Sequence, residues 1–163
     1  MNDSFILRDR IWREQNERVT LSSNATFASK SLGRYLDEEP DAFRTCFERD
    51  RDRIIHSKTF RRLKHKTQVF INPDGDHFIT RMTHTLNVTQ IGRSIAKTLG
   101  LNPDLTEAIC LGHDVGHSPF GHTGEDVLNE MLDGGWSHSE NSVRMLSVIE
   151  PLNLTKETLN GIE

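Results

Sequence analysis

Side chains that can do chemistry are concentrated in residues 112–125 of this chain. His113, His117 and His122 lie there with Asp114 and Glu125, among glycines and a proline rather than in an apolar stripe. Imidazole and carboxylate groups at this density indicate metal ligation or proton transfer more than core packing. Five of the eight histidines of the chain fall between residues 84 and 138. We therefore expect the functional site in this region.

His84 is a candidate partner of this stretch, because apolar residues follow it at helical steps. Val88, Ile91 and Ile95 come at intervals of four, three and four residues, which predicts that all four side chains face inward. An inward histidine on one helix and the His-Asp pair at the end of the next could converge on one divalent ion. Such nitrogen and oxygen donors suit Zn, Fe, Mn, Co or Ni. The alternative for His84 alone is a core histidine with a hydrogen-bonded partner.

The elements that must position these residues are predicted to be helices, since no alternation typical of β-strands persists anywhere. Gly100 is a favoured helix stop, and Asn102 with Pro103 forms a favoured helix start. Ser137 to Glu140 has the form of a capping box. The expected helices comprise residues 80–99, 103–114, a short one around 127–132, one carrying Val143, Leu146 and Ile149, and one from 155 to 163.

The first part of the chain is less regular. Residues 20–41 are rich in Ser, Asn, Gly and acids and predict an extended arm. Residues 47–69 are expected to form one basic amphipathic helix, followed by a turn at residues 72–76. We divide the chain into an N-terminal arm, 1–43, which is partly irregular, and a helical domain, 44–163.

Composition is that of an ordinary globular protein, with 163 residues, 34% hydrophobic and 27% charged. The net charge of −4 disfavours a general nucleic-acid binder, but residues 44–66 hold nine Lys or Arg against three acids. This basic block could line a catalytic or allosteric nucleotide site, or track a single nucleic-acid strand. The alternative is a solvated helix face that pairs with Glu48, Asp50 and Asp52. Lacking a leader or an apolar span, the sequence predicts a cytoplasmic protein with no membrane partner.

Six sequence blocks carry a family resemblance. In order and spacing they resemble the deoxyguanosinetriphosphate triphosphohydrolase-like branch of the HD-domain phosphohydrolases, over about residues 20–153. The blocks are Arg51-Asp52-Arg53-Ile54-Ile55-His56-Ser57, Phe60-Arg61-Arg62-Leu63, Lys66-Thr67-Gln68-Val69-Phe70, Gly75-Asp76-His77, Thr83-His84-Thr85-Leu86 and the stretch that opens at Gly112.

The resemblance implies an all-α HD-domain fold, here truncated, and an enzyme that hydrolyses a deoxynucleoside triphosphate (dNTP) to a deoxynucleoside and inorganic triphosphate. It implies a divalent metal ion (Mg, Mn, Fe, Co, Ni or Zn) as cofactor and a homo-oligomer as the complete assembly. The implied metal ligands are His84, His113 and Asp114, the implied catalytic residues are His117, Glu125, His122 and His138, and the implied substrate contacts are Arg81 and Gln68.

A mechanism follows from these expected roles. His117 would donate a proton to the leaving group, and Glu125 beside it would raise the pKa of the imidazole and keep it protonated near neutral pH. Arg81 would offset charge on the phosphate oxygens.

The chain departs from the family pattern in one respect. An HD site has a fourth ligand, an aspartate on a later helix, and no residue after Asp133 can fill that role. We therefore expect weak metal binding, helices missing at the C-terminus, and Leu159 and Ile162 left without packing partners. Two alternative functions stay open, a non-catalytic nucleotide-binding or oligomer-forming remnant and an HD phosphohydrolase that acts on another nucleotide.

Overall fold

The fold is all-α, as the sequence predicts. The computed structural model describes residues 8–66 and 79–163, and over these ranges it contains eight α-helices and no strand. They are α1 Arg10–Thr20, α2 Cys46–His56, α3 Lys58–Arg62, α4 Arg81–Leu99, α5 Pro103–Gly112, α6 Gly121–Met131, α7 His138–Arg144 and α8 Lys156–Ile162. Short 3-10 helices span Ala28–Lys30 and Leu63–His65, and a π-helical turn spans Met145–Ile149.

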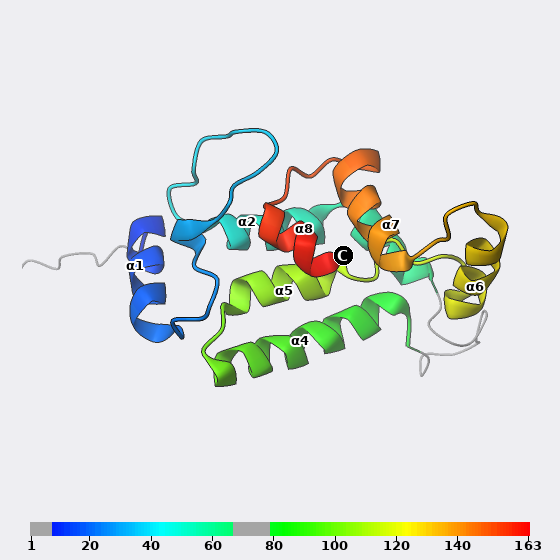
Figure 1. Ribbon diagram of the computed structural model, residues 1–163. Coiled ribbons are helices and arrows are strands. Elements are labelled where there is room, and N and C mark those ends of the chain that lie inside the picture. Colours follow the sequence, from blue (N-terminus) through cyan, green and yellow to red (C-terminus); the bar gives the residue numbers. More distant parts are fainter. Residues whose placement is uncertain (1–7, 67–78) are drawn as a thin grey trace, which may run out of the picture.

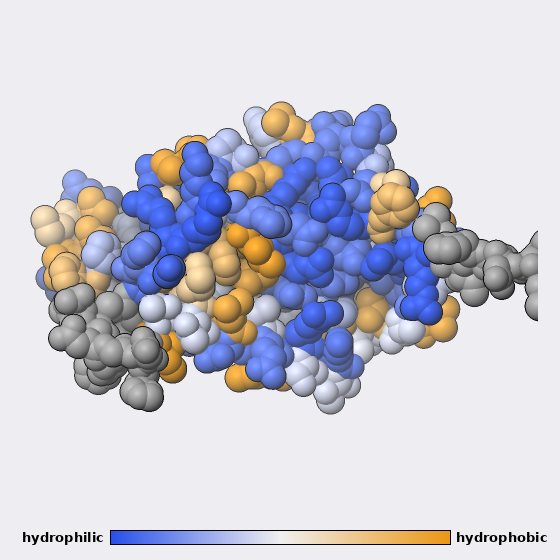
Figure 2. All heavy atoms as spheres, turned by 180° about the vertical axis from the view of Figure 1, so that it is seen from behind, coloured by the Kyte–Doolittle hydropathy of each residue, from blue (hydrophilic) through white to orange (hydrophobic). Residues whose placement is uncertain are grey.

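Helix α5 lies at the centre of the molecule and packs against α4, α2 and α8 (Figure 1). The core beneath it is formed by fully buried apolar side chains that include Ile54, Leu63, Leu111, Val115 and Leu146. Removing such side chains from water is the main stabilising term of a fold of this kind. The face in Figure 2 is mostly hydrophilic, with separate apolar groups between. No helix in the described ranges is long and apolar enough to cross a membrane.

Helix α4 has the predicted ends, but a different face turned inward. Thr80 caps its first turn and Gly100 ends it with a φ of 67°. Ile91 and Ile95, predicted to face the interior, are 58% and 53% exposed. The reason is a close helix crossing: a Cβ added to Gly92 would lie 2.8 Å from Cys110 Sγ on α5. The buried residues of α4 are Arg81, Thr85, Thr89 and Ala96, so the face turned inward is largely polar and carries no large apolar side chain that is fully buried.

The predicted helix over residues 47–69 is interrupted. The chain breaks from α2 into α3 at Ser57, which has an extended backbone and accepts a hydrogen bond from Phe60 N. Its hydroxyl also donates to Ile54 O at 2.7 Å, so one serine ends one helix and starts the next. Val69 and the predicted turn at residues 72–76 lie outside the described residues.

Helices α5, α7 and α8 begin as expected, whereas α6 begins at Gly121 rather than near residue 127, directly after Phe120 turns the chain with a φ of 67°. Asn102 caps α5, Ser137 caps α7 and Thr155 caps α8, each through its side-chain oxygen. Ser137 accepts from Ser139 N and so caps one residue earlier than a capping box does. The expectation that Leu159 and Ile162 lack packing partners is wrong, because Ile162 is 4% exposed and belongs to the main core, and Leu159 packs against that core.

The segment between α1 and α2 is irregular, as predicted for residues 20–41, but it is tied to the helices. Arg34 donates to the carboxylate of Asp50 and to the backbone carbonyls of Cys46 and Asn153. An isolated β-bridge joins Arg34 to Thr155. The arm thereby connects α2 to the start of α8. The boundary at residues 43 and 44 stays a prediction.

Gly116 is a position where the fold leaves no room for a side chain. A Cβ there would lie 2.2 Å from Ser142 N and 2.4 Å from Asn141 C, both backbone atoms of α7. We expect Gly116→Ala to lower the free energy of unfolding by about 2–4 kcal/mol, because the loop and α7 must move apart. Urea unfolding measures this, with Asn87→Ala on the exposed side of α4 as control. Equal stability of both variants would contradict the packing described.

Candidate functional site

Two groups of potential ligands flank the loop that follows α5. The first, which we call the HHD cluster, consists of His84 on α4 with His113 and Asp114 at the end of α5, and one donor atom of each lies within 4.8 Å of the others. The rings of His84 and His113 are 6.0 Å apart between centroids. The structure therefore brings together the three residues that the sequence predicts as metal ligands.

His113 is oriented for ligation by its own backbone. Its Nδ1 lies 2.7 Å from Cys110 O, which favours the tautomer that carries the proton on Nδ1. Its Nε2 lone pair is then directed away from the helix, 3.5 Å from Asp114 Oδ1. Ligating histidines commonly donate their second nitrogen to a carbonyl in this way, which fixes the ring.

Asp114 is held as a carboxylate by Arg81. Arg81 Nη1 donates to Asp114 Oδ2 at 3.0 Å, and both side chains are buried. Burial raises the pKa of Asp114, but the neighbouring His113 and Arg81 outweigh it and lower the pKa below its usual value. Arg81, predicted as a substrate contact, thus lies at the site beside a predicted ligand.

The loop itself is fixed by α7. Gly116 N donates to Ser142 Oγ at 2.9 Å, and the Ser142 hydroxyl in turn donates to His113 O at 2.8 Å. Asn141 Nδ2 donates to Gly116 O at 2.6 Å. These bonds explain why Gly116 must be small and how α7 sets the position of the ligands.

Lys66 is a residue of the site that the sequence reasoning did not single out. Its Nζ donates to Val115 O at 3.1 Å and to His117 O at 2.8 Å, so it supports the loop from the opposite side. Burial, together with the charges of Arg62 and Arg81, lowers the pKa of Lys66 to about 8. It opens the block Lys66-Thr67-Gln68-Val69-Phe70, in which only Gln68 was considered, so the signal was present.

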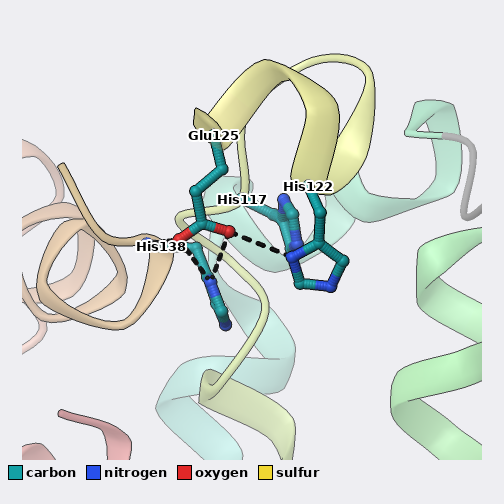
Figure 3. A group of neighbouring side chains, drawn as sticks. All are labelled: His117, His122, Glu125 and His138. Carbon is teal, nitrogen blue, oxygen red and sulfur yellow. Dashed lines mark hydrogen bonds and ion pairs between the residues drawn. The ribbon is translucent and has the colours of Figure 1, made fainter. Parts of the chain in front are cut away.

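The second group, which we call the HEH cluster, consists of His117, His122, Glu125 and His138 (Figure 3). Glu125 on α6 lies between two imidazoles, with His138 Nδ1 2.9 and 3.0 Å from its two oxygens and His122 Nδ1 3.1 Å from Oε2. His138 N also donates to Glu125 at 2.9 Å. The rings of His117 and His138 stack at 4.7 Å.

The expected pairing of Glu125 with His117 is wrong. Among the described residues, His117 Nδ1 is buried without a hydrogen-bond partner, and Glu125 pairs with His138 and His122 instead. Burial and the charge of Arg81 lower the pKa of His117 to about 4, so it is neutral at pH 7. Burial raises the pKa of Glu125, but hydrogen bonds from the backbone and side chain of His138 prevail and lower it to about 2.

Two further predictions concern substrate contacts, at Gln68 and along the basic block of residues 44–66. Gln68 lies outside the described residues. Three arginines of the basic block form ion pairs with neighbouring acids. Arg44 pairs with Asp41 and Asp52, Arg51 pairs with Asp52 and Asp104, and Arg53 pairs with Glu38. Most of these arginines thus serve surface ion pairs, each of which contributes little to stability.

The lowered pKa of His117 has a consequence for stability. The unfolded chain binds a proton at His117 below pH 6.5, whereas the folded chain resists it until about pH 4. The stability that neutral His117 contributes is therefore fully present above 6.5 and is lost as the pH falls toward 4. We expect unfolding midpoints measured at about pH 7 and about pH 5 to differ more for the wild type than for His117→Gln. Parallel pH profiles would exclude this role.

Comparison with known proteins decides the family. A family model described as "HD domain" matches residues 81–163, which begin at α4 and include the HHD cluster. The chain belongs to the HD-domain family. Curated relatives share the name deoxyguanosinetriphosphate triphosphohydrolase-like protein. One from Caldanaerobacter subterraneus is 60% identical over 153 residues, covering 91% of this chain and 45% of the relative. One from Clostridium tetani is 55% identical over 164 residues, covering 98% and 46%.

The chain spans less than half the length of these relatives. The HD-domain match agrees with the donor set of the HHD cluster, since HD domains are generally metal-dependent and this cluster offers two imidazoles and a carboxylate. His113 has its second nitrogen anchored and Asp114 is charged. These residues fit a divalent metal ion.

Proposed function

We propose that this HD-domain chain carries the catalytic centre of a metal-dependent phosphohydrolase that converts a deoxynucleoside triphosphate to a deoxynucleoside and inorganic triphosphate. The observation that carries the proposal is that the HHD and HEH clusters flank the loop that follows α5, where Asp114 of the first and His117 of the second both lie, so that potential metal ligands and paired proton-transfer groups are joined by a short stretch of chain. The names of the relatives support a nucleoside triphosphate of the dGTP type as substrate.

His84, His113 and Asp114 would hold the metal ion. When bound, a divalent ion supplies positive charge to phosphate oxygens and acidifies a water molecule. The donor set accepts Mn, Fe, Co, Ni or Zn readily and Mg through its carboxylate. Arg81 keeps Asp114 ionised and can turn part of its guanidinium toward the phosphate, because its Nε has no hydrogen-bond partner among the described residues.

The proton that the reaction needs at the leaving group comes, in this proposal, from the HEH cluster. As a water oxygen bonds to the α-phosphorus, the bond to the 5′ oxygen of the deoxynucleoside breaks, and that oxygen takes a proton. His122 is suited to give it, because its ring is 77% exposed and its Nδ1 lies 3.1 Å from Glu125 Oε2, a contact that orients the ring. Its second nitrogen faces away from Glu125 (Figure 3). His117, neutral at pH 7, instead packs against His138.

Product analysis tests the proposal. The chain is incubated with each of the four dNTPs and Mn²⁺ or Mg²⁺, and chromatography should find deoxynucleoside and triphosphate, with a chelator stopping the reaction. His122→Ala should lower turnover by about 10²-fold or more, while the exposed His65→Ala leaves it unchanged. Monophosphate as the product, or full turnover in His122→Ala, would refute the assigned chemistry. Absence of any product with all four nucleotides and both metals would reject catalysis by this chain.

A further inference from the structure

The HEH cluster offers the ligand types of a second metal site, separate from the HHD cluster. Its four potential ligands come from the loop (His117), from α6 (His122 and Glu125) and from the start of α7 (His138), and one donor atom of each lies within 4.8 Å of the others. The two clusters share no residue.

Three of the donors already stand close to the spacing that a tetrahedral ion requires. Zinc bonds of about 2.0–2.1 Å place neighbouring ligand atoms about 3.4 Å apart. In the structure, Glu125 oxygens lie 2.9 Å from His138 Nδ1 and 3.1 Å from His122 Nδ1. Small rotations of His122 and His138, which are 77% and 30% exposed, would widen these hydrogen bonds to ligand spacing.

The fourth donor is the observation that points to a ligand. His117 is 3% exposed, and its Nδ1 is buried without a hydrogen-bond partner among the residues of the two described ranges. Its ring stacks on His138 at 4.7 Å and meets His122 edge-on at 5.0 Å, so it lies within the cluster (Figure 3). A buried polar atom of this kind requires a partner, and a cation between the imidazoles would provide one.

The donor types select the ion. Three neutral imidazoles and one carboxylate match the ligands of Zn²⁺, whereas Mg²⁺ requires oxygen ligands at near-octahedral positions. We propose that the HEH cluster binds one Zn²⁺ ion through His117, His122, Glu125 and His138. This binding does not depend on the hydrolysis proposed above. Where that hydrolysis operates, a bound Zn²⁺ would engage His122 and thereby remove the proposed proton donor.

Metal stoichiometry in the absence of nucleotide tests this proposal. The chelator-treated chain is dialysed against Zn²⁺ with Mg²⁺ in excess, and bound zinc is measured by mass spectrometry. We expect the double variant His122→Ala/His138→Ala to bind one ion fewer per chain than the wild type. His84→Ala/His113→Ala should keep the ion of the HEH cluster, and the control His56→Ala/His65→Ala, with two exposed histidines outside both clusters, should match the wild type.

The result that overturns the proposal is equal zinc content in the wild type and in His122→Ala/His138→Ala. Circular dichroism of each variant establishes that it is folded, and Glu125→Gln serves as a second variant that removes an anionic ligand without removing an imidazole. Unchanged zinc content in both altered proteins would show that the HEH cluster is not a metal site. The hydrolysis test would be unaffected by that outcome, because it is performed with Mn²⁺ or Mg²⁺.

Discussion

Replacing Asp50 by alanine is expected to lower the free energy of unfolding by about 3–5 kcal/mol, the largest effect on stability that we predict. The Asp50 carboxylate is fully buried on α2 and accepts hydrogen bonds from Arg34 of the arm. It also accepts from Thr155 N at 2.9 Å and from the hydroxyls of Thr155 and Thr158, at 2.6 and 2.8 Å. Its removal takes the anionic partner from the buried Arg34 guanidinium and leaves buried donors of Thr155 and Thr158 without this acceptor.

Urea unfolding of three variants separates these contributions. Asp50→Asn keeps one acceptor oxygen and should lose less stability than Asp50→Ala, because the amide can still accept from Thr155. Asp133→Ala, at an exposed position near the end of α6, is the matched control and should change stability by less than about 0.5 kcal/mol. A loss below about 1 kcal/mol in Asp50→Ala would contradict the role of this carboxylate in joining the arm, α2 and α8.

The second large effect concerns metal affinity. We expect His84→Ala to weaken the binding of Mn²⁺ by at least about a hundredfold, because it removes one of three ligands of the HHD cluster. His84 is partly exposed, so the truncation should cost little stability. Isothermal titration with Mn²⁺ measures the affinity.

The exposed His56→Ala is the control for this titration, since it removes an imidazole from α2 outside both clusters. Mn²⁺ is preferred to Zn²⁺ here because it accepts mixed nitrogen and oxygen ligands and competes less for the imidazole-rich HEH cluster. If His84→Ala and the wild type bound Mn²⁺ equally, the assignment of His84 as a ligand would be wrong.

Local sequence signals predicted where most helices begin and end. Gly100 ended α4, Asn102 and Pro103 started α5, and Thr155 started α8, because caps depend on residues close in sequence. The same reasoning missed the break at Ser57, where basic and apolar residues continue at helical spacing on both sides. Ser57 ends α2 and caps α3 because its backbone is extended, and the spacing of apolar residues does not reveal the backbone conformation of a single serine.

The inward face of α4 shows a limit of periodicity. Ile91 and Ile95 predicted one face, but the close crossing at Gly92 turned another face toward α5. Which stripe is buried depends on the partner helix, and a glycine can decide it by allowing close approach. Apolar spacing alone therefore does not identify the buried face of a helix that carries a glycine at its crossing point.

The site was predicted in its members more than in its pairings. His84, His113 and Asp114 lie together as expected, because two neighbouring helices carry them. The predicted pairing of Glu125 with His117 is wrong, because whether Glu125 pairs with His117 or His138 depends on how α6 packs against the start of α7. Lys66 opens one of the blocks that carry the family resemblance, but because it acts through backbone carbonyls its contacts do not follow from side-chain spacing.

The most direct test of the proposed activity is hydrolysis of dGTP by this chain in ¹⁸O-labelled water with Mn²⁺. Attack of water at the α-phosphorus places one ¹⁸O atom in the released triphosphate and none in the deoxyguanosine. We predict this distribution, with the reaction lost in His84→Ala. Label in the deoxyguanosine, release of dGMP, or no Mn²⁺-dependent release of triphosphate would contradict the proposal.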